Sequence, residues 1–197
     1  MKIFNKIKSL YSLLGIQPKS KSNTVVDSIG SNTINNSIIE KRNPKSKIKF
    51  GSNSTISGRF VLNCENSLIE IGNNVSIGNS SIFECALEII VEDDVLISYQ
   101  CIIQDSNNHS LNLTERVNDN LNWNRKGIHD WTIPISKKVI IGRGSWLGAR
   151  AIILKGVELG EGCIVGAGSV VTKSFPAWSI IGGNPAKLIR TLTEEER

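Results

Sequence analysis

Apolar residues recur at every sixth position along much of this chain, with small or turn-forming residues between them. One run covers residues 71–101 and a second covers residues 141–171, while a looser run over residues 50–68 lies three residues out of phase with the first. A period of six fits neither the 3.6-residue repeat of a helix nor the simple alternation of a strand. The pattern predicts short strands joined by tight turns, repeated many times.

Smaller residues complete this pattern. The positions four residues after the apolar ones in the second run are small or β-branched, namely Ser145, Ala151, Val157, Cys163 and Ser169. Glycine often follows the apolar residue directly, and we expect it to permit the turn backbone. A single hexad cannot bury its own apolar face, so successive coils must stack. β-Branched residues and interior glycines argue against an amphipathic helix, and a β-sandwich needs longer strands at wider spacing. We therefore predict an all-β solenoid.

The C-terminal repeats resemble a known family. Residues 141–190, with the segments GAGSVV and GNPAK, look like the C-terminal half of hexapeptide-repeat O-acetyltransferases, which include bacterial capsule and lipopolysaccharide sugar acetyltransferases. The resemblance extends over about residues 50–190. It implies a left-handed parallel β-helix with three hexads per coil, acetyl-CoA as acyl donor, and a homotrimer whose sites lie between adjacent subunits.

The expected organisation is an N-terminal helical or irregular segment over residues 1–48, a β-helix domain over 49–190 and a tail over 191–197. The first 18 residues are too short and too interrupted by lysines for a membrane span. We expect a short helix there that covers an end of the domain or a neighbouring subunit; peripheral membrane contact is the alternative. No signal peptide is recognised, and the reduced core cysteines that we expect favour a cytoplasmic protein.

Charge and cysteine spacing narrow the chemistry. A net charge of +5 favours anionic ligands but does not choose among them. No nucleic-acid motif accompanies the charge, so no nucleic acid is expected as a partner. The four cysteines form no CxxC pair, and two histidines make an incomplete ligand set for zinc. We expect no metal.

The hexads stop between Cys101 and Val139, and we expect residues 104–138 to leave the coil as an extended loop, a common place for function. His109 stands where the chain departs. A neutral imidazole suits removal of a proton from a sugar hydroxyl, and the resembling family places its catalytic histidine at this point. Asp105 is a candidate to fix the imidazole tautomer, with an Asx turn as the alternative. His129 is a competing base for which we expect a structural or substrate-contact role.

Aromatic and basic residues of the same loop are candidates for acceptor binding. Trp123 and Trp131 offer flat apolar faces for a pyranose, and Arg116 and Arg125 are available to an acidic sugar. The alternative for both tryptophans is that they anchor the loop against a neighbouring subunit.

The resemblance also implies a CoA side of the site. Trp146 matches the position whose ring borders the pantetheine, the N–H of Gly148 is a candidate donor to the thioester oxygen, and Ala149 stands where some relatives carry serine. Ala167, Thr172 and Lys173 match further positions that line the CoA groove in the resembling enzymes. We expect Gly166 to let the cofactor approach the backbone closely, and Lys173 and Arg190 to meet the CoA phosphates.

We therefore expect an acetyl-CoA-dependent sugar O-acetyltransferase of bacterial surface-polysaccharide biosynthesis, which transfers the acetyl group directly with His109 as general base. One alternative is N-acetylation of a nucleotide-linked amino sugar. The other is a non-catalytic β-helix scaffold or a metal-dependent relative resembling γ-class carbonic anhydrases, although those need more histidines than this chain has.

Overall fold

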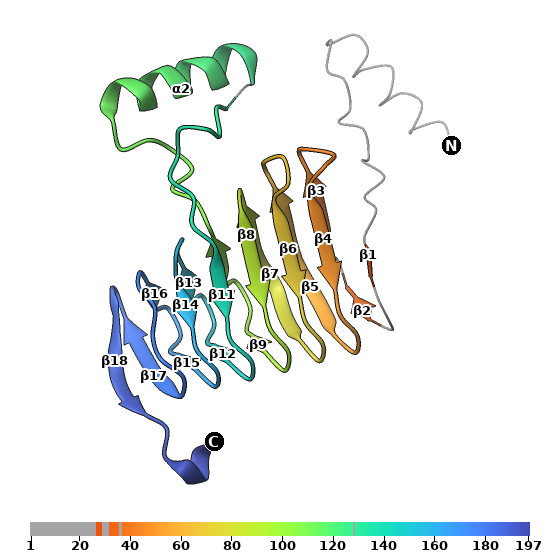
Figure 1. Cartoon of the computed structure of the whole chain (residues 1–197), viewed down its shortest axis with the longest axis vertical. Coiled ribbons are helices and arrows are strands. Elements are labelled where there is room, and N and C mark those ends of the chain that lie inside the picture. Colours follow the sequence, from red (N-terminus) through yellow and green to blue (C-terminus); the bar gives the residue numbers. More distant parts are fainter. Residues whose placement is uncertain (1–26, 29–31, 36, 128) are drawn as a thin grey trace, which may run out of the picture.

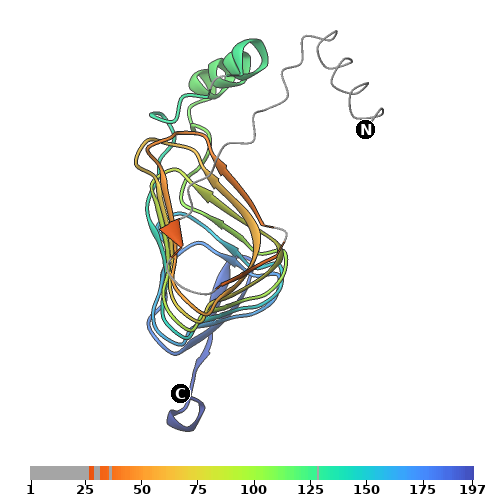
Figure 2. The same ribbon diagram turned by 90° about the vertical axis from the view of Figure 1, so that its right-hand side faces the viewer.

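The chain winds repeatedly through three faces of parallel strands (Figure 1). We describe residues 27–28, 32–35, 37–127 and 129–197 of a computed structural model. The first face contains β1 (Asp27–Ser28), β4 (Lys47–Phe50), β6 (Leu68–Ile71), β8 (Glu88–Val91), β11 (Val139–Ile141) and β14 (Glu158–Leu159), in that order. Viewed along the stack, the coils enclose a roughly triangular outline (Figure 2).

The other two faces form one continuous sheet, because two long strands turn the corner between them. These strands are β5 (Thr55–Leu62) and β7 (Ser76–Cys85). Their first residues pair within the second face, which also contains β2 (Thr33–Ile34), β9 (Leu96–Ile97), β12 (Trp146–Leu147), β15 (Ile164–Val165) and β17 (Ser179–Gly183). Their last residues pair within the third face, which also contains β3 (Ile38–Lys41), β10 (Ile102–Gln104), β13 (Ile152–Ile153) and β16 (Val170–Val171).

The two ends of the stack differ from the sequence prediction. Strands β1 to β4 begin before residue 49, so the strand-forming part starts earlier than predicted. The predicted N-terminal helix falls outside the described residues. At the other end, β18 (Ala186–Thr191) folds back antiparallel on β17, and a short 3₁₀ helix covers Glu194–Glu196. No helix in the described part of the chain is long and apolar enough to cross a membrane.

The predicted hexads are regular in the C-terminal coils. Ile141 stacks on Leu159, Leu147 on Val165 and Ile153 on Val171, and all six are buried. Each pair is 18 residues apart in the chain, which confirms three hexads per coil there. The small residues four positions after each apolar one, from Ser145 to Ser169, are buried as well. The core is therefore a column of apolar side chains that each coil extends.

The earlier coils are longer than the hexad pattern predicts. Ile71 stacks on Val91, 20 residues further along, rather than on Ile89. Two additional residues are accommodated at the corner after Cys85, where the third face turns into the first. Ile89 is still buried, because every second residue of the strand faces inward.

The glycines after the apolar residues allow coils to approach each other, which corrects the role we expected for them. A Cβ at Gly142 would lie 2.5 Å from the carbonyl oxygen of Leu159 in the next coil. The left-handed turn conformation occurs two residues later instead, at Gly144 with φ 67°. Close contact between coils therefore selects Gly142, and turn geometry selects Gly144.

All four cysteines carry free thiols. Cys85, Cys101 and Cys163 are buried, as the periodic pattern predicts for the last two. Burial, with a smaller contribution from the Asp105 carboxylate, raises the pKa of the Cys64 thiol to about 11. The three buried thiols therefore belong to the core, and the raised pKa of Cys64 disfavours its nucleophilic thiolate.

Candidate active site

The chain leaves the coil after β10 and returns at β11, and the segment between them, which we call the excursion, projects from one corner of the stack (Figure 1). Its two limbs are joined at the base, where the N–H of Asn107 donates to the carbonyl of Ile135 and the N–H of Lys137 donates to the carbonyl of Asp105. Instead of the extended loop that we predicted, it contains an α-helix, α2 (Leu113–Lys126).

Capping residues define both ends of α2. The side chain of Asn112 accepts hydrogen bonds from the N–H groups of Thr114 and Glu115, and Gly127 ends the helix in the left-handed conformation with φ 64°. The helix thus has fixed limits, and it carries Asp119 and Trp123 at fixed positions over the coils.

A cavity of about 560 Å³ lies under α2. Three successive coils contribute corner residues to it, and α2 and the two limbs of the excursion supply the rest. The lining residues are Arg42, Asn63, Glu84, Asn108, His109, Asp119, Asn120, Trp123, Gly127, His129 and Trp131. The cavity therefore contains both histidines of the chain and the two tryptophans that we predicted to contact a sugar.

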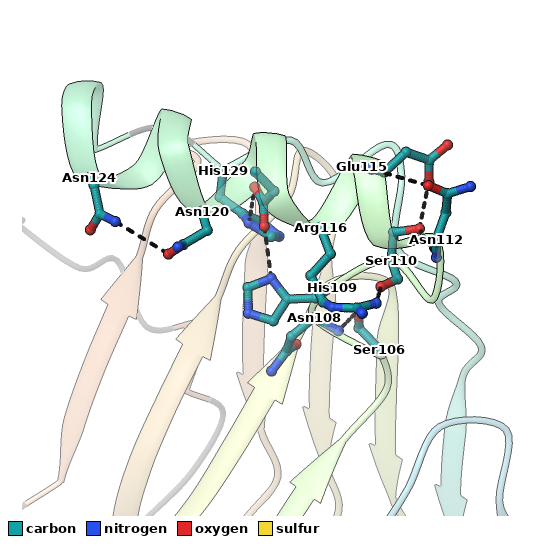
Figure 3. A network of polar contacts seen from close by, with 11 residues as sticks. Ser106, Asn108, His109, Ser110, Asn112, Glu115, Arg116, Asn120, Asn124 and His129 are labelled. Atoms are coloured by element: carbon teal, nitrogen blue, oxygen red, sulfur yellow. Dashed lines mark hydrogen bonds and ion pairs between the residues drawn. The ribbon is translucent and has the colours of Figure 1, made fainter.

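His109 is held in a defined orientation (Figure 3). The preceding Asn108 adopts a left-handed backbone with φ 61°, and its side chain donates to Glu84. The Nδ1 of His109 lies 2.7 Å from Oδ2 of Asp119, whose side chain is only 8% exposed. Because an ionised carboxylate can only accept, Nδ1 carries the proton and Nε2 keeps its lone pair. This is the tautomer that a general base needs.

His129 approaches the same carboxylate from the other side. Its Nδ1 lies 2.8 Å from Oδ1 of Asp119, within ion-pairing distance but without the alignment of a hydrogen bond. The ring packs edge to face against Trp131, with centroids 4.4 Å apart. Its Nε2 is buried and has no hydrogen-bond partner among the described residues. Asp119 is therefore shared between two imidazoles.

The same three side chains are spaced closely enough to be considered as metal ligands. The two N···O distances of 2.7 and 2.8 Å are those of hydrogen-bonded or ion-paired groups. Atoms that share a tetrahedral ion at the usual bond lengths of about 2.0–2.2 Å lie further apart than that. The spacing thus favours proton chemistry over coordination.

The prediction that Asp105 orients His109 is wrong. Asp105 is fully buried, and its carboxylate accepts hydrogen bonds from the N–H groups of Ala86, Leu87 and Glu88 and from the thiol of Cys85. Burial raises its pKa, and these hydrogen bonds oppose that rise. Asp105 therefore stabilises the wide corner of the neighbouring coil at residues 86–88. Asp105 itself lies where the excursion leaves the stack.

The predicted CoA-binding residues lie in the C-terminal coils, outside this cavity. Trp146 is about half exposed on β12 and lines a second hollow, of about 360 Å³, with residues of the C-terminal end. Ala149, Ala167, Thr172 and Lys173 lie in the turns that follow β12, β15 and β16. His109 and Trp146 thus line two different hollows.

Backbone hydrogen bonding revises the predicted oxyanion donor. The N–H of Gly148 donates to the carbonyl of Val165, and that of Gly166 donates to Ile181, so both are used in stacking coils. Within the described residues, the N–H of Ala149 has no acceptor, and Ala149 is partly exposed. The N–H of Gly148 is therefore occupied within the coil, whereas that of the next residue, Ala149, is not among the described backbone hydrogen bonds.

Two arginines that we predicted to bind ligands, Arg116 and Arg190, form hydrogen bonds within the chain instead. Arg116 donates to the carbonyls of Ser110 and Leu111 and does not line the cavity. Arg190 forms a two-fold ion pair with Glu196, which lowers the pKa of that carboxyl to about 2. Lys173 is exposed, with its ammonium 5.6 Å from the centre of the Phe175 ring. Arg116 and Arg190 therefore already have hydrogen-bond partners within the chain.

Comparison with known proteins agrees with the repeat and the fold. Residues 138–173 match the family described as the hexapeptide repeat of succinyl-transferase. A probable acetyltransferase of Mycobacterium tuberculosis is 26% identical over 144 residues, which are 73% of this chain but only 44% of that protein. The chain thus spans less than half the length of this curated relative.

Solved structures share the fold. A hexapeptide-repeat acetyltransferase of Vibrio cholerae, complexed with acetyl-CoA, superimposes with a TM-score of 0.59 and 26% identity over 74% of this chain and 71% of that one. The polySia-specific acetyltransferase NeuO superimposes with a TM-score of 0.63 and 24% identity, covering 84% of this chain and 85% of that one. The match at residues 138–173 shows the hexapeptide repeat in this part of the chain, and the solved structures show that the chain shares the fold of hexapeptide-repeat acetyltransferases.

Proposed function

We propose that this protein transfers an acetyl group from acetyl-CoA to a sugar hydroxyl and that His109 is the general base. The observation that carries the proposal is the contact between His109 and the nearly buried Asp119 inside a cavity with two tryptophans. This contact sets the imidazole tautomer and stabilises the imidazolium that forms when the base takes a proton.

The chemistry follows from this arrangement. The Nε2 of His109 removes the proton of the acceptor hydroxyl while its oxygen attacks the acetyl carbonyl carbon. The tetrahedral intermediate collapses, the carbon–sulfur bond breaks, and the imidazolium returns its proton to the departing thiolate. The products are a sugar ester and CoA, and no acetylated enzyme is required. Such a base contributes roughly 10²–10⁴-fold to the rate.

The donor side of the site is proposed to come from a second copy of the chain. His109 and Trp146 line separate hollows, so one copy does not assemble the reactants by itself. We propose a left-handed coil and a homotrimer in which Trp146, Ala149, Ala167, Thr172 and Lys173 of one subunit bind acetyl-CoA beside His109 of the next. The free N–H of Ala149 then becomes the donor to the acetyl oxygen.

The outer side of α2 supports a contact between subunits. Leu113, Val117 and Leu121 follow one another at four-residue spacing, and all three are exposed. The opposite side of the helix carries Asp119 and Trp123 over the cavity. Covering this apolar stripe with a neighbouring subunit removes it from water.

The biological setting belongs to the same proposal. We place the enzyme in the cytoplasm, in bacterial surface-polysaccharide biosynthesis. N-acetylation of a nucleotide-linked amino sugar is the second candidate, since the same base also serves an amine. The buried Nε2 of His129 does not discriminate between the two acceptors, because either a hydroxyl or an amine can donate a hydrogen bond to it.

Product analysis tests the proposal. The full-length protein is incubated with radiolabelled acetyl-CoA and a panel of glycans, and the labelled product is treated with mild alkali. We expect label transfer that alkali releases, as for an ester. Alkali-resistant label would favour the amide, and failure to bind or turn over acetyl-CoA would reject the enzyme in favour of a scaffold.

A further inference from the structure

The corner residues of three consecutive coils define the chemistry of the cavity opposite α2. Arg42 follows β3, Asn63 follows β5, and Glu84 lies near the end of β7. Strands β3, β5 and β7 are neighbours, so the three residues lie close together at one end of these strands, with Glu84 opposite Val61 rather than Asn63. We call these three residues the row. The row lies beneath α2 and contributes to the same cavity as His109.

The side-chain amide of Asn63 has a buried N–H donor without an acceptor among the described residues. Its Oδ1 accepts a hydrogen bond of 2.8 Å from the guanidinium of Arg42, which fixes the orientation of the amide because a guanidinium only donates. The Nδ2 is buried and has no partner among the described residues, and Asn63 is only 6% exposed. A buried donor left without an acceptor is unfavourable. A ligand oxygen in the cavity would satisfy it.

Glu84 offers the complementary function. Its carboxylate accepts one hydrogen bond, of 3.2 Å, from the side chain of Asn108, and it lines the cavity. A carboxylate has room for several donors. A hydroxyl can therefore donate to Glu84 while a neighbouring oxygen of the same ligand accepts from Asn63, which is the alternation of roles that a polyol satisfies.

The opposite wall supplies aromatic surface. Trp123 projects from α2 with about half of its side chain exposed, and Trp131 is partly buried against His129. Both line the cavity, whose volume of about 560 Å³ falls in the range of small-molecule sites. A ring with an apolar face and hydroxyls at its edge fits such a wall.

The charges of the lining argue against an acidic ligand. Two carboxylates, Glu84 and Asp119, face one guanidinium, that of Arg42. Arg42 is already hydrogen-bonded to Asn63 and lies 3.6 Å from Glu40. Arg116 does not line the cavity, and neither does Arg125. A carboxylated sugar would thus meet more negative than positive charge.

From these contacts we infer that the acceptor unit bound beside His109 is a non-acidic, hydroxyl-rich pyranose, held between Trp123 and the row of Arg42, Asn63 and Glu84. The inference rests on the proposed function, since it assigns the acceptor class of that site. Asn63 recognises an acceptor oxygen of the sugar, and Glu84 both binds a hydroxyl and disfavours anionic sugars.

Binding of two glycosides, measured without acetyl-CoA, tests the inference. Saturation-transfer NMR at low salt compares methyl glucoside and methyl glucuronide on the full-length protein. We expect the glucoside to bind about tenfold more tightly than the glucuronide, because a like charge disfavours the latter. Glu84→Gln should weaken the glucoside and reduce this preference to about threefold or less. Trp123→Ala, at an exposed position of α2, should abolish detectable binding of the glucoside.

A matched control and the transfer assay separate the outcomes. Glu158→Gln changes an exposed glutamate of β14, outside the cavity, and should leave the preference at its wild-type value. Glucuronide binding as tightly as the glucoside, no binding of either glycoside, or an unchanged preference in Glu84→Gln would overturn the inference. Glucoside binding without acetyl transfer would reject the proposed function but keep the acceptor class. Acetyl transfer to acidic sugars alone would keep the proposed function but reject the acceptor class.

Discussion

Among single residues, Asp119 determines the geometry of the candidate site. It lies on α2, is nearly buried, and contacts the Nδ1 atoms of both His109 and His129. The helix brings it to His109 from ten positions further along the chain. A carboxylate in this position fixes one tautomer of His109 and would stabilise the imidazolium that forms in the proposed reaction.

Replacing Asp119 by Asn should slow transfer without weakening donor binding. An amide cannot stabilise the imidazolium by charge, and its NH₂ group, when it faces Nδ1, favours the wrong tautomer. We expect kcat to fall roughly tenfold or more, with the KM for acetyl-CoA unchanged. Asp130→Asn, at an exposed aspartate of the same excursion, serves as control and should keep wild-type kcat. Wild-type kcat in Asp119→Asn would show that Asp119 does not position the base.

Replacing Asp105 by Asn should instead affect stability. The Asn NH₂ group would face N–H donors of the 86–88 corner and leave one or more of them without an acceptor. We expect the free energy of unfolding in urea to fall by about 1–3 kcal/mol, since buried donors lose their partners. Activity per folded molecule should remain close to wild type. A large loss of kcat with an unchanged unfolding midpoint would return Asp105 to a catalytic role.

At the scale of elements, α2 is what turns a corner of the stack into a cavity. Its inner side contributes Asp119, Asn120 and Trp123, and its outer side is apolar and exposed. Only Asp119 is buried in the helix, so α2 makes little core contact of its own. Its limits therefore depend on the caps, Asn112 and Gly127.

Removing the N-cap of α2 should loosen the site and leave the coils intact. Asn112→Ala deletes the side chain that accepts from Thr114 and Glu115, a change worth about 1 kcal/mol of helix stability. We expect faster amide hydrogen exchange in α2 and a lower kcat, with unchanged exchange in β11 to β16. Asn122→Ala, an exposed mid-helix change, should alter neither. Equal protection of α2 in wild type and Asn112→Ala would contradict this dependence on the cap.

The elements differ in how well the sequence alone predicts them. Regular spacing predicts the C-terminal coils to the residue, because burial in a solenoid repeats with the backbone. It fails by two residues after Cys85, where a corner is widened and held by the distant Asp105. The hexad spacing also does not predict α2, although other signals for this helix are present. They are the N-cap Asn112, the C-cap Gly127 and the apolar residues 113, 117 and 121 at helical spacing. Pairing of His109 with Asp119 depends on how that helix folds back, which no local pattern encodes.

At the scale of the whole molecule, the separate hollows of His109 and Trp146 predict that activity needs more than one copy. His109→Ala and Trp146→Ala chains, each impaired alone, should regain activity when co-assembled, because some interfaces then combine an intact His109 with an intact Trp146. Mass measurement of the mixed assembly provides the oligomeric state. Active monomers, or co-assembled variants no more active than their parents, would contradict the shared site.

The central claim is that His109 is the base of an acetyl transfer. The most direct measurement is the initial rate of acetyl transfer by His109→Ala relative to wild type, with acetyl-CoA binding measured on the same samples. We predict a loss of roughly 10²–10⁴-fold in rate with donor binding retained, since the substitution removes only the proton acceptor. Transfer at the wild-type rate by a folded His109→Ala protein would contradict the account.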